Sequence, residues 1–159
     1  LELKTSSFDI LSKVKSLTAE RKSLVNELSQ LRRDMALAEG AGESDELESE
    51  DLSGVNFVVK KLSGIPGKEL PSLIDGYKQK LSKGVILLIS DNDGKVAIAS
   101  GVTSDLVPSV SAVDVVKAVA AKLGGMGGGG RPDLAQAGGS SMEGIDSAID
   151  AVKSLIISR

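Results

Sequence analysis

The sequence predicts an α/β protein in which a long N-terminal helix or helical arm precedes a layered α/β domain with a mixed sheet and a glycine-rich loop. Three observations support this prediction: heptad-like apolar spacing near the N-terminus, strand-like runs that alternate with helical periods, and a dense cluster of glycines near the C-terminus. The 159 residues divide into a helical arm over 1–38, an acidic linker over 39–53 and a glycine-motif domain over 54–159.

The arm has the apolar spacing of one long helix. Steps of four and three residues, interrupted only by Arg21, connect Ile10, Val14, Leu17, Leu24, Leu28, Leu31, Met35 and Ala38. Ser6 or Ser7 is a candidate N-cap, because a serine hydroxyl can accept a hydrogen bond from a free amide of the first turn. Such a narrow apolar stripe needs a partner helix, either elsewhere in the protein or in a second copy. Residues 8–38 are therefore a candidate coiled coil for homodimer formation.

The acidic charge of the chain is concentrated in one short segment. Residues 39–51 carry seven acidic and no basic side chains, whereas residues 1–38 and 52–159 each have a net charge of +2. Like charges mixed with Gly and Ser cannot bury themselves, so we expect a solvated linker over 39–53. The mildly basic flanks permit nucleic-acid binding without requiring it.

Three strands are expected in the domain, over 55–62, 84–90 and 95–101. The second is apolar throughout, which is typical of a strand buried on both faces. A hairpin turn at 91–94 joins it to the third, with Asn92 or Gly94 able to adopt a positive φ.

Three helices are expected, over 68–81, 112–123 and 142–157. The first should begin near Leu70, since Pro71 is tolerated only in a first turn. The candidate N-caps of the other two are Ser111 or Asp114, and Ser140 or Ser141.

The composition argues against catalysis by this chain. It contains neither His nor Cys, which removes the commonest general base, the commonest metal ligand and every disulfide. We expect no catalytic residue, no metal site and no small-molecule substrate. No apolar run approaches the roughly 18 residues of a membrane helix, and the start does not read as a secretory signal. A cytoplasmic protein without a membrane partner is expected, and Leu1 in place of Met suggests a piece of a longer chain.

Residues 124–139 read GGMGGGGRPDLAQAGG, and eight of them are glycine. This density suggests that the backbone approaches a ligand closely, with consecutive amides forming a concave nest for phosphate; a flexible linker is the alternative. Two phosphate-binding signatures fail here. The dinucleotide-type glycine spacing follows a helix instead of a strand, and Walker-like spacing has Arg131 and Pro132 where Lys and Ser or Thr are required.

The segment 124–139 resembles the glycine motif that closes bacterial alanyl-tRNA synthetases, usually close to G-G-K-G-G-G-R-P-D-M-A-Q-A-G-G. The segments FDILSKVKSLTAERKSLVNELSQL, GKVAIASGVTSDL and GIDSAIDAVKSLI are similar to other parts of the same tail domain. A related, shorter glycine motif occurs in the domain associated with DHH-type phosphoesterases. One departure is Met126, which stands where the family often has Lys and removes a positive charge.

The resemblance implies a non-catalytic module that grips the tRNA elbow, where the D- and T-loops meet, and supports aminoacylation and editing by upstream domains. No cofactor is expected in this chain, because ATP, magnesium and zinc belong to those upstream domains. Two alternatives stay open. One is the nucleic-acid-binding C-terminal domain of a DHH-type phosphoesterase, and the other is an oligomerisation module driven by the helix.

The candidate RNA contacts lie in and near the glycine segment. Arg131 can form a bidentate contact with phosphate or a guanine edge, and Gln136 offers a donor and an acceptor to a base or a 2′-hydroxyl. Pro132 and Asp133 are expected to be structural, with Asp133 bonding amides or holding Arg131. The other candidate contacts are Lys95, Lys122, Gly124, Gly125, Gly127, Gly128, Gly129, Gly130, Gly138 and Gly139.

Overall fold

The computed structural model describes residues 10–38, 49–92 and 94–159, which form two compact units divided between Met35 and Ala36. Helix α1 (Ile10–Ala38), which ends just past this division, confirms the helix expected from the heptad spacing. Its large apolar side chains are between 42% and 74% exposed at Ile10, Leu11, Val14, Leu17, Leu24, Val25, Leu28 and Leu31. The N-cap candidates Ser6 and Ser7 lie outside the described residues.

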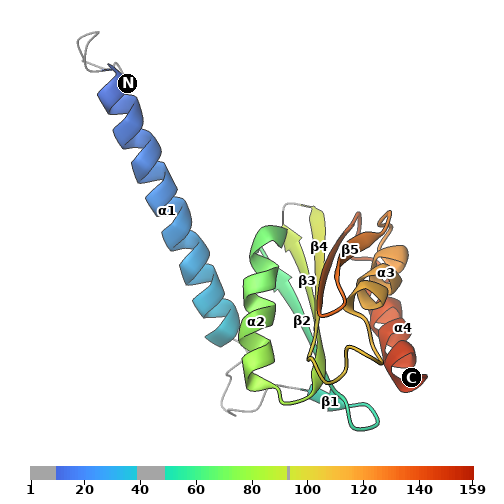
Figure 1. Cartoon of the computed structure of the whole chain (residues 1–159). Coiled ribbons are helices and arrows are strands. Elements are labelled where there is room, and N and C mark those ends of the chain that lie inside the picture. Colours follow the sequence, from blue (N-terminus) through green and yellow to red (C-terminus); the bar gives the residue numbers. More distant parts are fainter. Residues whose placement is uncertain (1–9, 39–48, 93) are drawn as a thin grey trace. The chain divides into compact units, whose positions relative to one another are not determined.

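The described residues of the second unit are built on one six-stranded sheet (Figure 1). The sheet is mixed, as the sequence predicted, and it has more than the three strands that were expected. The strand order is β1-β2-β3-β4-β6-β5. The pair β2–β3 is parallel and the other four pairs are antiparallel. The strands are β1 (Ser49–Asp51), β2 (Asn56–Ser63), β3 (Gly84–Asn92), β4 (Lys95–Val102), β5 (Gly128–Arg131) and β6 (Leu134–Gly139).

Helices cover both faces of the sheet. Helix α2 (Leu70–Lys80), preceded by the 3₁₀ turn Gly67–Glu69, lies on one face, and α3 (Ala112–Lys122) and α4 (Ile145–Ile157) lie on the other (Figure 1). Two apolar cores result, and the central strand β3 contributes to both of them. The apolar run 84–90 is therefore buried on both faces, as its composition predicted.

The helix caps agree with the sequence analysis at one helix and differ at another. Ser111 caps α3, since its hydroxyl accepts a hydrogen bond of 3.3 Å from the Val113 amide. For α4 the expected caps were wrong, because the N-cap is Gly144 at a φ of 85° and makes no side-chain cap bond. Ser141 instead accepts from the Glu143 amide, and the Ser140 hydroxyl donates to backbone carbonyls at the end of α3.

An edge strand, β1, lies within the segment expected to be a linker. Of that segment, residues 39–48 lie outside the described part of the chain. Asp51 is in register with Asn56 of β2, and Glu50 forms an ion pair with Lys153 of α4. The backbone pairs while the acidic side chains remain exposed, and the next residue, Leu52, is only 7% exposed. Acidic residues are depleted in strands, so the composition of Ser49–Asp51 did not predict strand β1.

The glycine segment is a hairpin and not a loop throughout. Residues 124–127 precede the strands, β5 and β6 follow, and Pro132 and Asp133 form the turn between them. These two strands were not expected, because glycine weakens strands. The packing supplies the reason for several glycines. A Cβ on Gly128 would lie 2.6 Å from the Ala137 Cβ and 3.0 Å from Val116 of α3.

Substitution by alanine at two glycines of this segment should have different effects on stability. At Gly125 an added Cβ would lie 2.0 Å from the carbonyl oxygen of Gly138, so we expect Gly125→Ala to lower the free energy of unfolding by about 1–3 kcal/mol. At Gly129 nothing lies within 4 Å and φ is not positive, so Gly129→Ala should leave stability unchanged or raise it by up to about 1 kcal/mol. Urea unfolding measures both. Equal unfolding midpoints for the two variants would contradict the packing described here.

Candidate nucleic-acid interface

The Pro132–Asp133 turn is held by three separate elements. The Ala112 amide at the start of α3 donates to the Pro132 carbonyl at 2.8 Å. The Val102 amide at the end of β4 donates to the Asp133 carbonyl at 3.0 Å. The Lys78 ammonium of α2 donates to the same Asp133 carbonyl at 2.7 Å. Both carbonyls of the turn are therefore bonded, and the turn has a defined place between the two helical layers.

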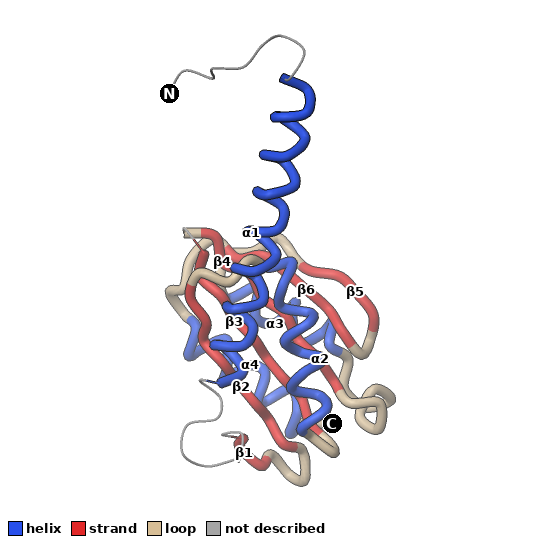
Figure 2. The backbone as a smooth tube through the Cα atoms, turned by 90° about the vertical axis from the view of Figure 1, so that its left-hand side faces the viewer, coloured by secondary structure: helices blue, strands red, loops and turns tan. Residues whose placement is uncertain are grey.

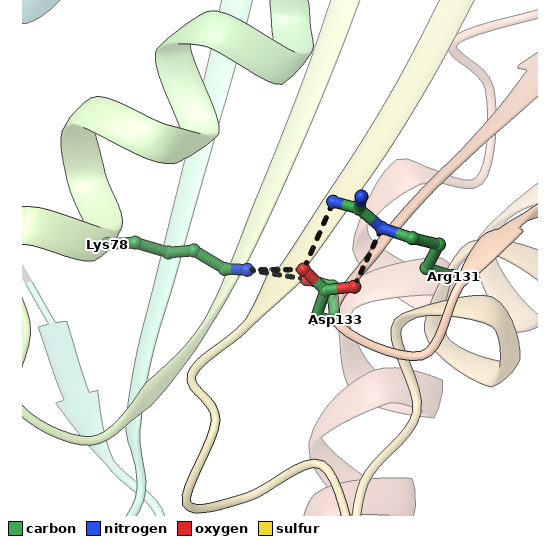
Figure 3. Close-up of polar contacts among 3 residues, drawn as sticks. All are labelled: Lys78, Arg131 and Asp133. Carbon is green, nitrogen blue, oxygen red and sulfur yellow. Dashed lines mark hydrogen bonds and ion pairs between the residues drawn. The ribbon is translucent and has the colours of Figure 1, made fainter.

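The side chains around this turn form a charged cluster of Lys78, Arg131 and Asp133 (Figure 3). Arg131 makes a two-point contact with the Asp133 carboxylate, with Nε 3.1 Å from Oδ1 and Nη2 3.3 Å from Oδ2. Lys78 Nζ lies 3.5 Å from Oδ2 on the other side. Asp133 thus holds Arg131, which is one of the two structural roles expected for it. The Arg131 side chain is 72% exposed, whereas that of Lys78 is 19% exposed.

The cluster stabilises the ionised form of Asp133. Partial burial raises the pKa of the Asp133 carboxyl, but the positive charges of Lys78 and Arg131 and the hydrogen bonds from Arg131 and the backbone lower it more. The pKa therefore lies below its ordinary value of 3.8. At neutral pH the carboxylate is charged and can orient the Arg131 guanidinium.

Lys78 was not singled out from the sequence. It precedes Asp133 by 55 residues, and lysines in the last turn of a helix are usually solvated. One signal was present: Lys78 follows the buried Ile74 by four residues, which places it beside the apolar stripe of α2. A glycine opposite gives it room. A Cβ on Gly101 of β4 would lie 2.2 Å from Ile74 and 3.2 Å from Lys78 Cε.

The hairpin presents one open face on the α2 side of the sheet. Because Gly129 is in register with Gln136 and Arg131 with Leu134, these residues share a face with Gly138, and alternate residues such as Gly128 face α3. Figure 2 shows β5 along the edge of the sheet. Gly138, like Gly129, has room for a Cβ, since its nearest neighbour lies 3.9 Å away.

Gln136 is less available than the sequence suggested. Its Nε2 donates to the Gly67 carbonyl at 2.7 Å, so one of its two amide N–H donors is used within the protein. The concave nest of amides is not formed by Gly128–Arg131 either, because these four residues are in a strand paired with β6. What the edge strand offers instead is a row of alternate N–H groups that point away from β6.

The two lysines predicted as contacts do not lie near Arg131. Val96 is in register with Gly139 and Gly101 with Leu134, so Lys95 lies at the opposite end of β4, roughly 17 Å or more away. Lys122 lies at the C-terminal end of α3, in the layer on the other face of the sheet. Met126 is fully exposed.

Backbone conformation or packing at the end of α3 explains three glycines, namely Gly124, Gly125 and Gly139. Gly124 has a φ of 68°, a conformation that side chains rarely adopt. A Cβ on Gly139 would lie 3.1 Å from Leu123, and one on Gly125 would overlap Gly138. These positions thus have a structural reason to be glycine that is independent of any ligand.

A shallow pocket of about 300 Å³ adjoins the charged cluster. It is lined by Lys78, Leu81, Ser82, Val102, Thr103, Ser104 and Asp133. Within residues 10–38, 49–92 and 94–159, no three His, Cys, Asp or Glu side chains are grouped so that they could hold a metal ion. In the same ranges no helix has the length and apolar character needed to cross a membrane.

The charge on Asp133 should make a pH-dependent contribution to stability. Since its pKa is lowered on folding, the contribution is complete above pH 3.8 and is lost as the pH falls through the folded-state pKa. We expect Asp133→Asn to be less stable than the wild type at pH 6, with a difference in unfolding free energy that shrinks towards pH 3. Urea unfolding at several pH values measures this difference. A gap that stayed constant would show that the cluster contributes nothing through charge.

Comparison with known proteins identifies the domain. Residues 54–158 match the family model of the DHHA1 domain. Over 154 residues, or 97% of this chain, the sequence is 51% identical to the alanine–tRNA ligase of Dinoroseobacter shibae and 49% identical to that of Ruegeria pomeroyi. The match spans only 17% of the length of each of these ligases.

Solved structures agree with this result. The C-Ala domain of Aquifex aeolicus alanyl-tRNA synthetase superposes with a TM-score of 0.65 and 28% identity, covering 69% of this chain and 98% of that one. RecJ from Thermus thermophilus has a TM-score of 0.60 over 95% of this chain and 20% of its own, and at 16% identity it shares the fold alone. The resemblance to the alanyl-tRNA synthetase tail is confirmed, and the chain belongs to the DHHA1 domain family.

Proposed function

We propose that this chain is a non-catalytic tail module of an alanine–tRNA ligase and that it binds tRNA. The observation that carries the proposal is the Arg131 guanidinium, which is exposed, aimed by Asp133 and located in the segment that resembles the synthetase glycine motif. Two of its five N–H donors bond Asp133, and the others can meet phosphate oxygens. ATP, magnesium and zinc then serve the remainder of such a ligase and not this module.

The open face of the hairpin suits a sugar–phosphate backbone. At Gly129 and Gly138 this face has no side chain, so a ligand can approach the sheet closely there, and the edge of β5 adds backbone donors. Base stacking is a poorer fit. Phe57 is 2% exposed and Tyr77 is fully buried, while the remaining aromatic residue, Phe8, lies outside the described part of the chain.

These features favour recognition of RNA shape, for which the outer corner of tRNA, its elbow, is our proposed target. Binding there leaves the acceptor end free for aminoacylation and editing by other domains. A role on tRNA also implies a cytoplasmic location. The exposed apolar side chains of α1 support association through residues 8–38, either with a second copy or with another part of the ligase.

The second candidate is the nucleic-acid-binding domain of a DHH-type phosphoesterase. The likeness to RecJ extends over 95% of this chain and favours it. The 51% identity to an alanine–tRNA ligase, against 16% to RecJ, makes the ligase tail the better explanation.

A titration separates the two candidates. We expect this chain to bind folded tRNA more tightly than single-stranded RNA of equal length, and the affinity should fall as salt rises because phosphate contacts release counterions. Fluorescence anisotropy at two salt concentrations measures both properties. Equal or tighter binding of the single strand would favour the phosphoesterase candidate, and no binding of either RNA would contradict the proposed function.

Arg131→Ala should weaken tRNA binding by roughly ten- to a hundredfold, because it removes the aimed cation while leaving the backbone of the turn in place. The slope of log affinity against log salt should become shallower by about one. Lys117→Ala is the matched control, since Lys117 is an exposed cation of α3 on the other face of the sheet. If the two variants bind alike, Arg131 is not part of the interface.

A further inference from the structure

We propose that Lys78 is a positioning residue for the Arg131 contact, which acts through Asp133 without touching the RNA. This inference rests on the proposed function. It concerns a residue of α2 that lies 55 positions before the turn and outside the glycine segment. Its claim is specific: the contribution of Lys78 to RNA binding exists only while Arg131 is present.

The geometry directs the Lys78 ammonium inward. Nζ lies 2.7 Å from the Asp133 carbonyl oxygen and 3.5 Å from Oδ2. An ammonium has three N–H donors, and both of the oxygens near this one belong to Asp133. The side chain is 19% exposed, compared with 72% for Arg131. Lys78 is therefore committed to Asp133, while Arg131 presents its outer edge to solvent.

A glycine of the sheet leaves room for the aliphatic part of the Lys78 side chain. This part runs from α2 over Gly101 of β4, where an added Cβ would come within 3.2 Å of Lys78 Cε. Asp133 then connects the two cations, with Lys78 on one oxygen and Arg131 on both. Removing Lys78 leaves Oδ2 bonded by Arg131 alone and the Asp133 carbonyl bonded by the Val102 amide alone. The Arg131–Asp133 pair then has more orientations available, and ordering it on the RNA costs more entropy.

A double-mutant cycle tests the inference. We expect Lys78→Met to weaken tRNA binding by roughly three- to tenfold in the wild-type background. In the Arg131→Ala background the same change should have no effect on affinity or on salt slope. Lys78→Arg should restore most of the binding, because a guanidinium can also donate to the carboxylate and the carbonyl. Titrations at low salt keep the weak variants measurable.

The matched control is Lys80→Met, which removes the same charge from an exposed position two residues further along α2. We expect it to change affinity less than Lys78→Met does. Urea unfolding of every variant separates lost binding from lost folding. If Lys78→Met lowers stability and weakens binding by the same factor in the wild-type and the Arg131→Ala backgrounds, the role of Lys78 is purely structural. That result would overturn the inference.

The outcomes also separate this inference from the proposed function. If Lys78→Met weakens binding equally in both backgrounds and lowers the salt slope, Lys78 contacts phosphate itself and the positioning role is wrong, although tRNA binding stands. If Lys78→Met leaves wild-type affinity unchanged, the role is wrong as well. If the wild-type chain binds no tRNA, it is the proposed function that fails.

Discussion

The Pro132–Asp133 turn is the junction on which the arrangement of the candidate interface depends. Its two carbonyls accept from the backbone of α3, the backbone of β4 and the side chain of α2, so one short turn joins both helical layers to the sheet. Asp133 adds a carboxylate between two cations at the same point. Because the turn is held from three sides, the guanidinium that it aims starts from a restricted set of orientations. Preorganisation of this kind lowers the entropy lost on binding.

The glycine segment serves packing and access at different positions. At Gly125 and Gly128 a side chain would collide with the hairpin itself or with α3, so glycine is required for the fold. At Gly129 and Gly138 a side chain has room, and glycine there leaves an uncovered patch of sheet. A single dense motif therefore combines two physical requirements. Substituting the whole segment would confuse them, whereas single substitutions keep them apart.

The charge at the candidate interface differs in sign from the net charge of the whole chain. The net charge of −3 reflects an acidic run over 39–51, whereas the candidate interface is a cluster of two cations and one anion. Partial neutralisation by Asp133 leaves the cluster with one net positive charge, and Arg131 is its more exposed cation. Among the residues that the structure describes, the face beside it carries no exposed aromatic side chain, and two of its positions, Gly129 and Gly138, are uncovered. Such a surface recognises the backbone and shape of an RNA more readily than its bases.

The sequence by itself determined the α/β class, the long first helix, the central apolar strand and the family likeness, because each depends on periodicity or on a motif of neighbouring residues. It also offered the pairing of Asp133 with Arg131 as one of two structural roles for Asp133, and the structure shows that pairing. Only the tertiary structure decided that the glycines of 128–131 form an edge strand, that Ser49–Asp51 pair with β2, and that α4 is capped by Gly144. It likewise separated Lys95 and Lys122 from Arg131 and brought Lys78 to Asp133. These features arise from contacts between distant segments, or from turns that such contacts hold. The free energy of those contacts outweighs the local preferences of glycine and acidic residues against strands and of lysine for solvent.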